Sequence, residues 1–234
     1  MNEILNIIGD SYSDTNIKKN DDETTYLELL EQDFQVKNYS YHGVGPQYIF
    51  EKLTYNNVGN FLFVILPDVK RIKFNYLTDN NIASPVAIWR QLKTIGTYDF
   101  PKSFEKYEDK YEQIYKDFEA FESSNMFNIL PSLYVQYIIS FYQKCKKILI
   151  WLTSEYDLQI NFLPDNCKIM SKSLNKISKE ENVRKKTIKN YGQDFRNNHL
   201  SKDNHIIMYN FLIDYFLHDK FYEPKFKKYN RVIK

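Results

Sequence analysis

The chain has 234 residues, 43% of them hydrophobic and 26% charged, which indicates a globular protein rather than a disordered one. Its two cysteines, Cys145 and Cys167, lack the spacing of a metal site or a Cys-x-x-Cys motif, so we expect a reducing, cytoplasmic compartment. No apolar stretch approaches the ~20 residues that a membrane span requires, and the start of the chain does not resemble a signal peptide. Since no internal repeat or linker interrupts the chain, we expect one domain over residues 1–234.

The first elements in chain order alternate short apolar runs with amphipathic segments. Residues 4–8 form an apolar run that ends at Gly9, which predicts a short buried strand. The continuous apolar runs at 61–66 and 148–152 are typical of parallel strands that are covered on both faces. Strands that alternate with helices predict right-handed crossovers and a parallel sheet. The pattern also predicts a helix over 23–33 capped by Asp21 or Asp22, a strand over 34–39 and a helix over 47–53 after Pro46.

A helical insertion around 100–145 is predicted between the last two apolar runs. Apolar residues that recur three and four apart predict an amphipathic helix over 103–122 with Ser103 as its N-cap. This stripe either packs on its own domain or serves as an oligomer contact or substrate lid. A second helix is predicted over 133–146, with Leu133 on its apolar face. The stripe of the first helix comprises Phe104, Tyr107, Tyr111, Ile114, Phe118 and Phe121.

The last predicted helix begins after Ser201, a good N-cap residue, and its neighbourhood holds two of the four histidines. His199 lies on the loop before the helix, where its side chain can point into a cleft. His205 lies in the first turn, where packing against the core is the more common role. His218, at the end of the helix, is expected to be solvated, and His42 follows the second predicted strand.

Ser11 follows the first predicted strand. In a parallel sheet, ligands bind beyond the carboxyl ends of the strands. Gly9 permits a tight turn there, and the N–H groups after the strand can donate to an anion. A nucleophilic serine also needs a base within hydrogen-bond reach, and His199 is the best-placed candidate. The alternative is an ordinary turn.

Four segments in this order resemble the SGNH/GDSL hydrolase family. They are GDSYSD at 9–14, the loop HGVGPQ at 42–47, the apolar run at 61–66 and HLSKDNH at 199–205. The order and placement match over essentially the whole chain. The resemblance implies a three-layer α/β/α sandwich, flavodoxin-like, with a parallel sheet of about five strands.

The resemblance also implies an activity and its residues. Ser11 would be the nucleophile and His199 the base, while the N–H groups of Ser11 and of Gly45, or next Gly43, would form the oxyanion hole. Asp10 would support the nucleophile, although capping the turn is an equally consistent role. The implied reaction is hydrolysis of a small acyl ester, such as an O-acetyl group on a carbohydrate, and it needs no metal or organic cofactor.

The chain departs from the family after the third apolar run. The family usually has G-x-N-D there, and its Asn donates to the oxyanion. If Asp68 matches the Asp of that motif, Pro67 takes the place of the Asn, and proline has no N–H donor. Arg71 would supply a replacement positive charge, or it is a surface residue. Losing one oxyanion donor costs ~10²–10³ in rate, so a weakened enzyme is expected.

A second departure concerns the acid that orients the base. The family places an Asp three residues before its His, and this chain has Arg196 there. Asp194, five residues before His199, would complete the triad if the loop bulges. Otherwise the enzyme would work as a Ser–His dyad with a backbone carbonyl as the orienting group, or Asp194 is a solvated loop residue.

Two basic segments lie in the last third of the chain. Residues 168–190 hold eight Lys or Arg and two Glu, and residues 220–234 hold six and one, although the whole chain carries only +2. Solvated surface is the simplest interpretation, and the alternative is an anionic partner. Nucleic acid is the less favoured partner. The second candidate function is therefore a catalytically weakened domain that binds a glycan or an anionic partner, and the oligomeric state stays open.

Overall fold

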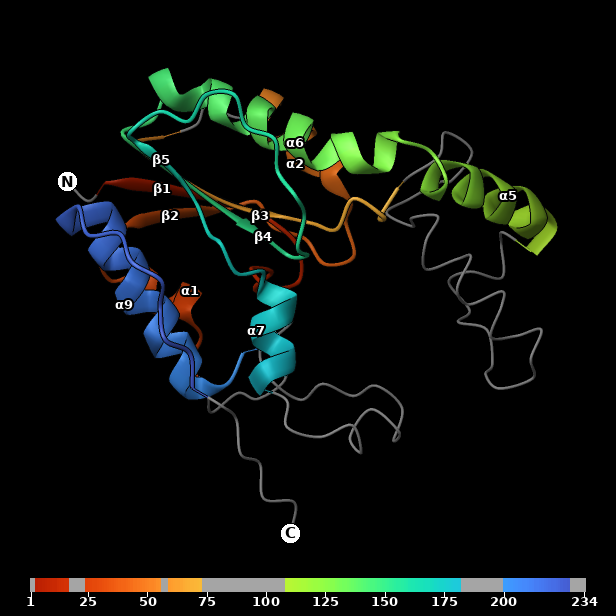
Figure 1. Cartoon of the computed structure of the whole chain (residues 1–234). Coiled ribbons are helices and arrows are strands. Elements are labelled where there is room, and N and C mark those ends of the chain that lie inside the picture. The colour runs from red at the N-terminus through yellow and green to blue at the C-terminus, as the bar shows by residue number, and fades with distance from the viewer. Residues whose placement is uncertain (1–2, 17–23, 56–58, 73–107, 182–199, 228–234) are drawn as a thin grey trace, which may run out of the picture.

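The computed structural model describes residues 3–16, 24–55, 59–72, 108–181 and 200–227. Its centre is a five-stranded parallel sheet in the order β2-β1-β3-β4-β5 (Figure 1). This confirms the predicted α/β class and the number of strands. The strands are β1 (Ile4–Ile8), β2 (Gln35–Asn38), β3 (Phe61–Leu66), β4 (Lys147–Leu152) and β5 (Cys167–Ile169).

Helices cover both faces of the sheet, as the three-layer architecture requires (Figure 1). One face carries α1 (Tyr26–Leu30), α7 (Leu174–Glu181) and α9 (Lys202–His218), and the other carries α2 (Pro46–Tyr55) and α6 (Met126–Ile139). Helix α5 (Tyr111–Glu122) extends away from the sheet. Among the described helices, none is both long and apolar enough to cross a bilayer.

Each face of the sheet contributes to a separate hydrophobic core, because successive side chains of a strand point to opposite faces. All six residues of β3 are buried. Phe63 belongs to the core under α1 and α9, whereas its neighbour Val64 belongs to the core under α2 and α6. The continuous apolar runs of the sequence therefore correspond to strands buried on both faces, as predicted.

The first helix is shorter than predicted and has a different cap. It begins at Tyr26, and Thr25 and Glu28 form a capping box in which each side chain accepts a hydrogen bond from the backbone N–H of the other. The predicted caps, Asp21 and Asp22, lie outside the described residues. A capping box satisfies two N–H groups at the helix start, so Thr25 sets the boundary.

The helical insertion differs from the prediction in its second helix. Helix α6 begins at Met126, seven residues before the predicted start, and Pro131 lies inside it. The predicted start at Leu133 was therefore wrong. The buried face holds Val135 and, as predicted, Ile138, whereas Leu133, expected on that face, is 48% exposed.

The described part of the 103–122 stripe packs within the protein. Helix α5 begins after a 3₁₀ turn, Glu108–Lys110, and Ile114 and Phe118 on its apolar face are buried. These two residues favour packing on the same chain over an exposed oligomer contact. Ser103, the predicted N-cap, lies outside the described residues.

The last helix agrees with its prediction. Helix α9 has Ser201 as its N-cap residue, and its apolar stripe is buried against α1 and the sheet. The stripe comprises Met208, Phe211, Leu212 and Tyr215.

Strand β5 was not located from the sequence. It has only three residues, and its register is set by pairing with β4, where Cys167 lies opposite Ile148. A run of three residues is too short to show a period, so pairing with β4 decides its place.

We expect both cysteines to be unreactive in the folded protein. Burial raises the pKa of Cys145 to about 11, despite the nearby charge of Lys144, and burial together with Cys145 raises that of Cys167 to about 12. Since the thiolate is the nucleophile, a disulfide reagent at pH 8 should label neither thiol until denaturant is added. Rapid labelling of the native protein would contradict the buried placement.

Candidate active site

The order of the strands defines where a site is expected. Strands β1 and β3 are neighbours, but the chain leaves β1 toward β2 on one side and leaves β3 toward β4 on the other. The loops that follow β1 and β3 therefore run in opposite directions. Ligands of doubly wound sheets bind at such a switch point, beyond the carboxyl ends of the strands. Ser11 follows β1 and Asp68 follows β3, so the fold brings both loops to this edge of the sheet.

A tight turn presents Ser11 at the end of β1. The N–H of Ser13 donates to the carbonyl oxygen of Asp10 at 3.0 Å, and the N–H of Tyr12 donates to Oδ1 of Asp10 at 3.1 Å. Gly9 is required because a Cβ there would lie 2.8 Å from Cβ of Ile65. Asp10 therefore has the turn-capping role that the sequence suggested. In this turn Ser11 is partly exposed.

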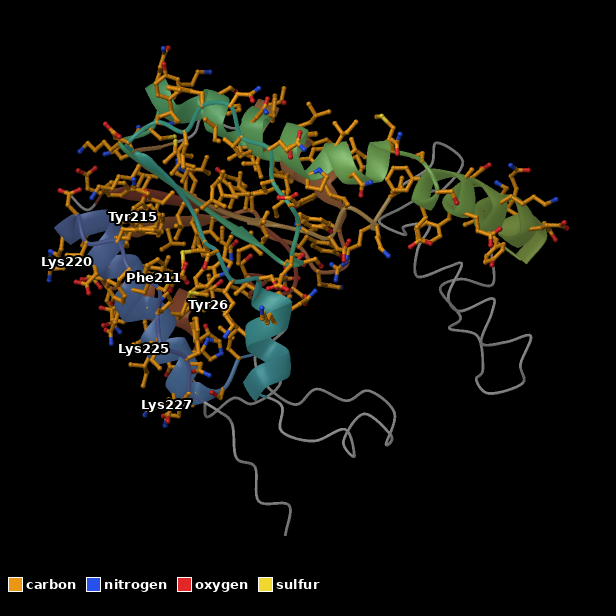
Figure 2. All side chains as sticks on the ribbon, in the orientation of Figure 1. Tyr26, Phe211, Tyr215, Lys220, Lys225 and Lys227 are labelled. Carbon is orange, nitrogen blue, oxygen red and sulfur yellow. The ribbon has the colours of Figure 1, made fainter. Side chains whose placement is uncertain are left out.

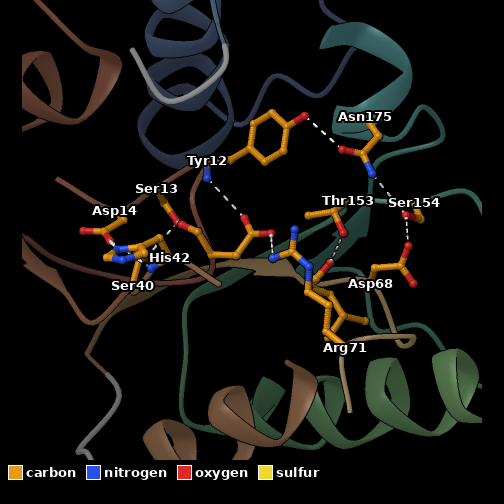
Figure 3. A network of polar contacts seen from close by, with 12 residues as sticks. Tyr12, Ser13, Asp14, Ser40, His42, Asp68, Arg71, Thr153, Ser154 and Asn175 are labelled. Atoms are coloured by element: carbon orange, nitrogen blue, oxygen red, sulfur yellow. Dashed lines mark hydrogen bonds and ion pairs between the residues drawn. The ribbon is translucent and has the colours of Figure 1, made fainter. Parts of the chain in front are cut away.

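Asp10 also binds Arg71. The Asp10 side chain is fully buried, and Nη1 of Arg71 lies 3.2 Å from its Oδ2 (Figure 3). A turn after β3, in which the N–H of Arg71 donates to the carbonyl oxygen of Asp68 at 2.9 Å, brings the guanidinium there. The side chain of Arg71 is only 30% exposed, so the alternative that Arg71 is a surface residue does not hold.

The two glycines expected in the oxyanion hole have different surroundings. Gly45 is buried, and a Cβ there would overlap the carbonyl oxygen of Arg71. Gly43 is exposed, with a φ of +72° in the left-handed region. The loops after β1, β2 and β3 therefore meet at Arg71, through Asp10 on one side and Gly45 on the other.

We expect Gly45→Ala to be more harmful than Gly43→Asn. A methyl group at Gly45 would push the Arg71 backbone away, which costs about 1–3 kcal/mol of unfolding free energy. Asn tolerates the left-handed region and a Cβ at Gly43 meets no atom, so that variant should lose less than about 1 kcal/mol. Urea denaturation measures both, and the opposite order would contradict the close contact between the two loops.

Asp68 links the loop after β3 to the segment after β4. Oγ of Ser154 donates to Oδ2 of Asp68 at 2.7 Å (Figure 3). The hydroxyl of Tyr156 donates to Oδ1 of Asp68 at 2.7 Å. Burial and Asp68 raise the pKa of Tyr156 well above its usual value. Pro67, directly before Asp68, is buried and offers no N–H.

The same network continues to the turn that bears Ser11. The amide of Asn175 on α7 donates to Oγ of Ser154 at 3.2 Å, and its oxygen accepts from the hydroxyl of Tyr12 at 3.0 Å (Figure 3). The sequence reasoning missed these residues. Only the position of Tyr12 inside GDSYSD could have indicated a role, because the other partners come from elements distant in the chain.

A histidine–carboxylate pair lies beside the turn that bears Ser11. Oδ2 of Asp14, whose side chain is fully buried, is 2.7 Å from Nδ1 of His42 and accepts the backbone N–H of His42 at 2.8 Å. Oγ of Ser13 and Oγ of Ser40 are 2.7 Å apart in the same interface. The sequence had placed His42 only on a loop, and it had no signal for this pairing.

His199 and Asp194, the predicted base and acid, lie outside the described residues, as does Arg196. The neighbouring start of α9 is described and is linked to the turn that bears Ser11 through Tyr26. The backbone N–H of Tyr26 donates to Nδ1 of His205 at 3.3 Å, and the hydroxyl of Tyr26 donates to the carbonyl oxygen of Tyr12 at 2.9 Å. His205 is fully buried, in agreement with its predicted packing role.

No group of three or more His, Cys, Asp or Glu side chains suited to a metal ion occurs within the described ranges. Neither a protein-family model, nor a curated protein, nor a solved structure matches the sequence. What the site does must therefore be inferred from its residues and their geometry.

Proposed function

We propose that the protein is a serine hydrolase of the SGNH/GDSL type that cleaves an acyl ester. The observation that carries this proposal is Ser11, partly exposed on a turn at the switch point of the sheet, between two buried carboxylates. Asp10 and Asp14 each bind the loop of another strand, so the turn that bears Ser11 is held on both sides. A nucleophile gains most when its surroundings are fixed before the substrate binds.

The proposed reaction has two halves. His199 accepts the Ser11 proton as Oγ bonds to the acyl carbon, and it returns the proton to the leaving alcohol as the C–O bond breaks. Water then hydrolyses the acyl-enzyme. The N–H groups of Ser11 and Gly45, or Gly43, stabilise the negative charge on the carbonyl oxygen, and Asp194 orients the imidazole.

Two observations support these roles. The start of α9, which follows His199 in the chain, is joined to the turn that bears Ser11 through Tyr26. The guanidinium of Arg71 pairs with Asp10, the residue directly before Ser11. It is therefore our candidate for the group that stabilises the oxyanion in place of the Asn that Pro67 replaces. The substrate class, a small acyl ester such as an O-acetyl carbohydrate, rests on the family resemblance alone.

A fluorophosphonate probe tests the proposal because it reacts with an activated serine. We expect the folded protein to be labelled, with the adduct mapped to the Ser11 peptide by mass spectrometry. Protein that is heat-denatured before the probe is added should not be labelled. Folded protein that is not labelled would contradict the hydrolase function.

The second candidate function is a domain of weakened chemistry that binds a glycan or an anionic partner. Pro67 favours it, since the donor expected there is missing. The basic C-terminal segment lends less support. Lys220 and Lys227 lie beside α9 (Figure 2) and contact its residues Asp214 and Asp203, at 3.4 and 3.1 Å respectively. Binding to an anionic polymer that falls steeply with salt, without probe labelling, would favour this function.

A further inference from the structure

The pair formed by Asp14 and His42 has a defined protonation pattern. Oδ1 of Asp14 accepts the N–H and the side-chain amide of Asn16, both at 2.9 Å, while Oδ2 faces His42. Burial raises the pKa of Asp14, but the hydrogen bonds from Asn16 and His42 outweigh burial and lower it overall. Asp14 is therefore a carboxylate, which can only accept hydrogen bonds.

A carboxylate at Nδ1 decides which nitrogen of His42 holds the proton. Nδ1 must donate to Asp14, so the neutral ring carries its lone pair on Nε2. The side chain of His42 is half exposed, and the ring of Tyr41 stacks on it with centroids 4.6 Å apart. Across the described residues, no hydrogen bond to Nε2 is present, so this nitrogen is a fixed proton acceptor open to solvent.

The pair lies at the edge of the sheet where Ser11 is presented. Asp14 follows directly after the turn that spans residues 10–13, and His42 belongs to the loop that carries Gly43 and Gly45. Other ionisable groups near the pair are Tyr41 on the same loop and Tyr48 and Glu51 on α2; Asp14 helps raise the pKa of Tyr48. None of these groups offers a competing cation at the imidazole.

We propose that His42, oriented by Asp14, is a second proton acceptor of this site and activates the water that hydrolyses the acyl-enzyme. Nε2 takes a proton from water as the water oxygen bonds to the acyl carbon. The bond between that carbon and Oγ of Ser11 then breaks, and the proton passes from Nε2 to Oγ, which restores the serine hydroxyl. This inference rests on the proposed function.

The test separates the two half-reactions in His42→Gln and in a control, His218→Gln, which alters an exposed histidine at the end of α9. Fluorophosphonate labelling reports the attack by Ser11 and should stay within about threefold of the unmodified protein in both variants. Turnover of p-nitrophenyl acetate should fall about 100-fold in His42→Gln only, with an acetyl adduct on Ser11 accumulating in the intact mass spectrum.

Each outcome bears on either the role of His42 or the proposed function. Unchanged turnover in His42→Gln, or labelling that falls in parallel with turnover, would overturn the role in deacylation. Absence of labelling in the unmodified protein would overturn the proposed function and this inference with it. Nitrogen-15 NMR tests the pair without any substrate: we expect the neutral ring of His42 to be protonated at Nδ1, with this preference lost in Asp14→Asn, and a ring protonated at Nε2 would overturn the inference.

Discussion

If Ser11 is the nucleophile, Ser11→Ala should lower ester hydrolysis to the background rate, a loss of up to about 10⁶-fold, because the variant lacks the atom that would form the acyl-enzyme. Fluorophosphonate labelling should disappear at the same time. Stability should change little, since Ser11 is partly exposed on its turn. Hydrolysis rates and urea denaturation of the same preparations measure both effects.

Ser13→Ala is the matched control for this prediction. Ser13 lies two residues further along the same turn, is buried, and pairs its hydroxyl with Ser40. Its loss should cost about 1 kcal/mol of unfolding free energy and leave labelling in place. Labelling that persists in Ser11→Ala but is lost in Ser13→Ala would mean that the nucleophile has been assigned to the wrong serine.

Arg71→Met should lower both stability and activity. The variant takes away the cation beside the fully buried carboxylate of Asp10, a change that costs about 3–5 kcal/mol when both partners are buried. We expect about 3 kcal/mol, the low end, because Arg71 is 30% exposed. Hydrolysis should also fall by about 10²–10³-fold if the guanidinium stabilises the oxyanion.

The double variant Asp10→Asn with Arg71→Met separates the two effects. A neutral amide at Asp10 removes the buried negative charge that faced Arg71, so much of the lost stability should return, while activity stays low because the guanidinium is still missing. Denaturation midpoints and hydrolysis rates of the single and double variants form a mutant cycle. If the double variant is no more stable than Arg71→Met, the ion pair does not couple the two residues, and the loops after β1 and β3 are held by other contacts.

The arrangement of the loops has a consequence for the proposed oxyanion hole. Arg71 contacts Asp10 through its side chain and Gly45 through its backbone, so a shift of the turn after β3 moves both expected N–H donors. Asp68, in that turn, accepts hydrogen bonds from Ser154 and Tyr156. Although Pro67 replaces the Asn donor, the turn that follows it is held by Asp10, by Gly45 and by the segment after β4. Fixed positions of the remaining donors are what would make such an oxyanion hole effective.

The local pattern of the sequence determined the elements that need only local information. The apolar runs at 61–66 and 148–152 correspond to β3 and to most of β4 because a strand buried on both faces must be apolar at every position. The position of Ser201 at the start of α9 was recognised because helix starts depend on a few neighbouring residues, although its side chain makes no capping hydrogen bond. The turn at Ser11 could be located because a glycine, an aspartate and a serine directly follow a strand.

Tertiary structure decided the partners. Asp10 pairs with Arg71 across 61 residues, Asp14 with His42 across 28, and Asp68 with Ser154 across 86. Pairs so far apart leave no periodic signal in the chain, since the strand order alone brings their loops to one edge of the sheet. The sequence by itself therefore determined where Ser11 is presented, whereas the packing of the loops decided which carboxylates, cations and histidine surround it.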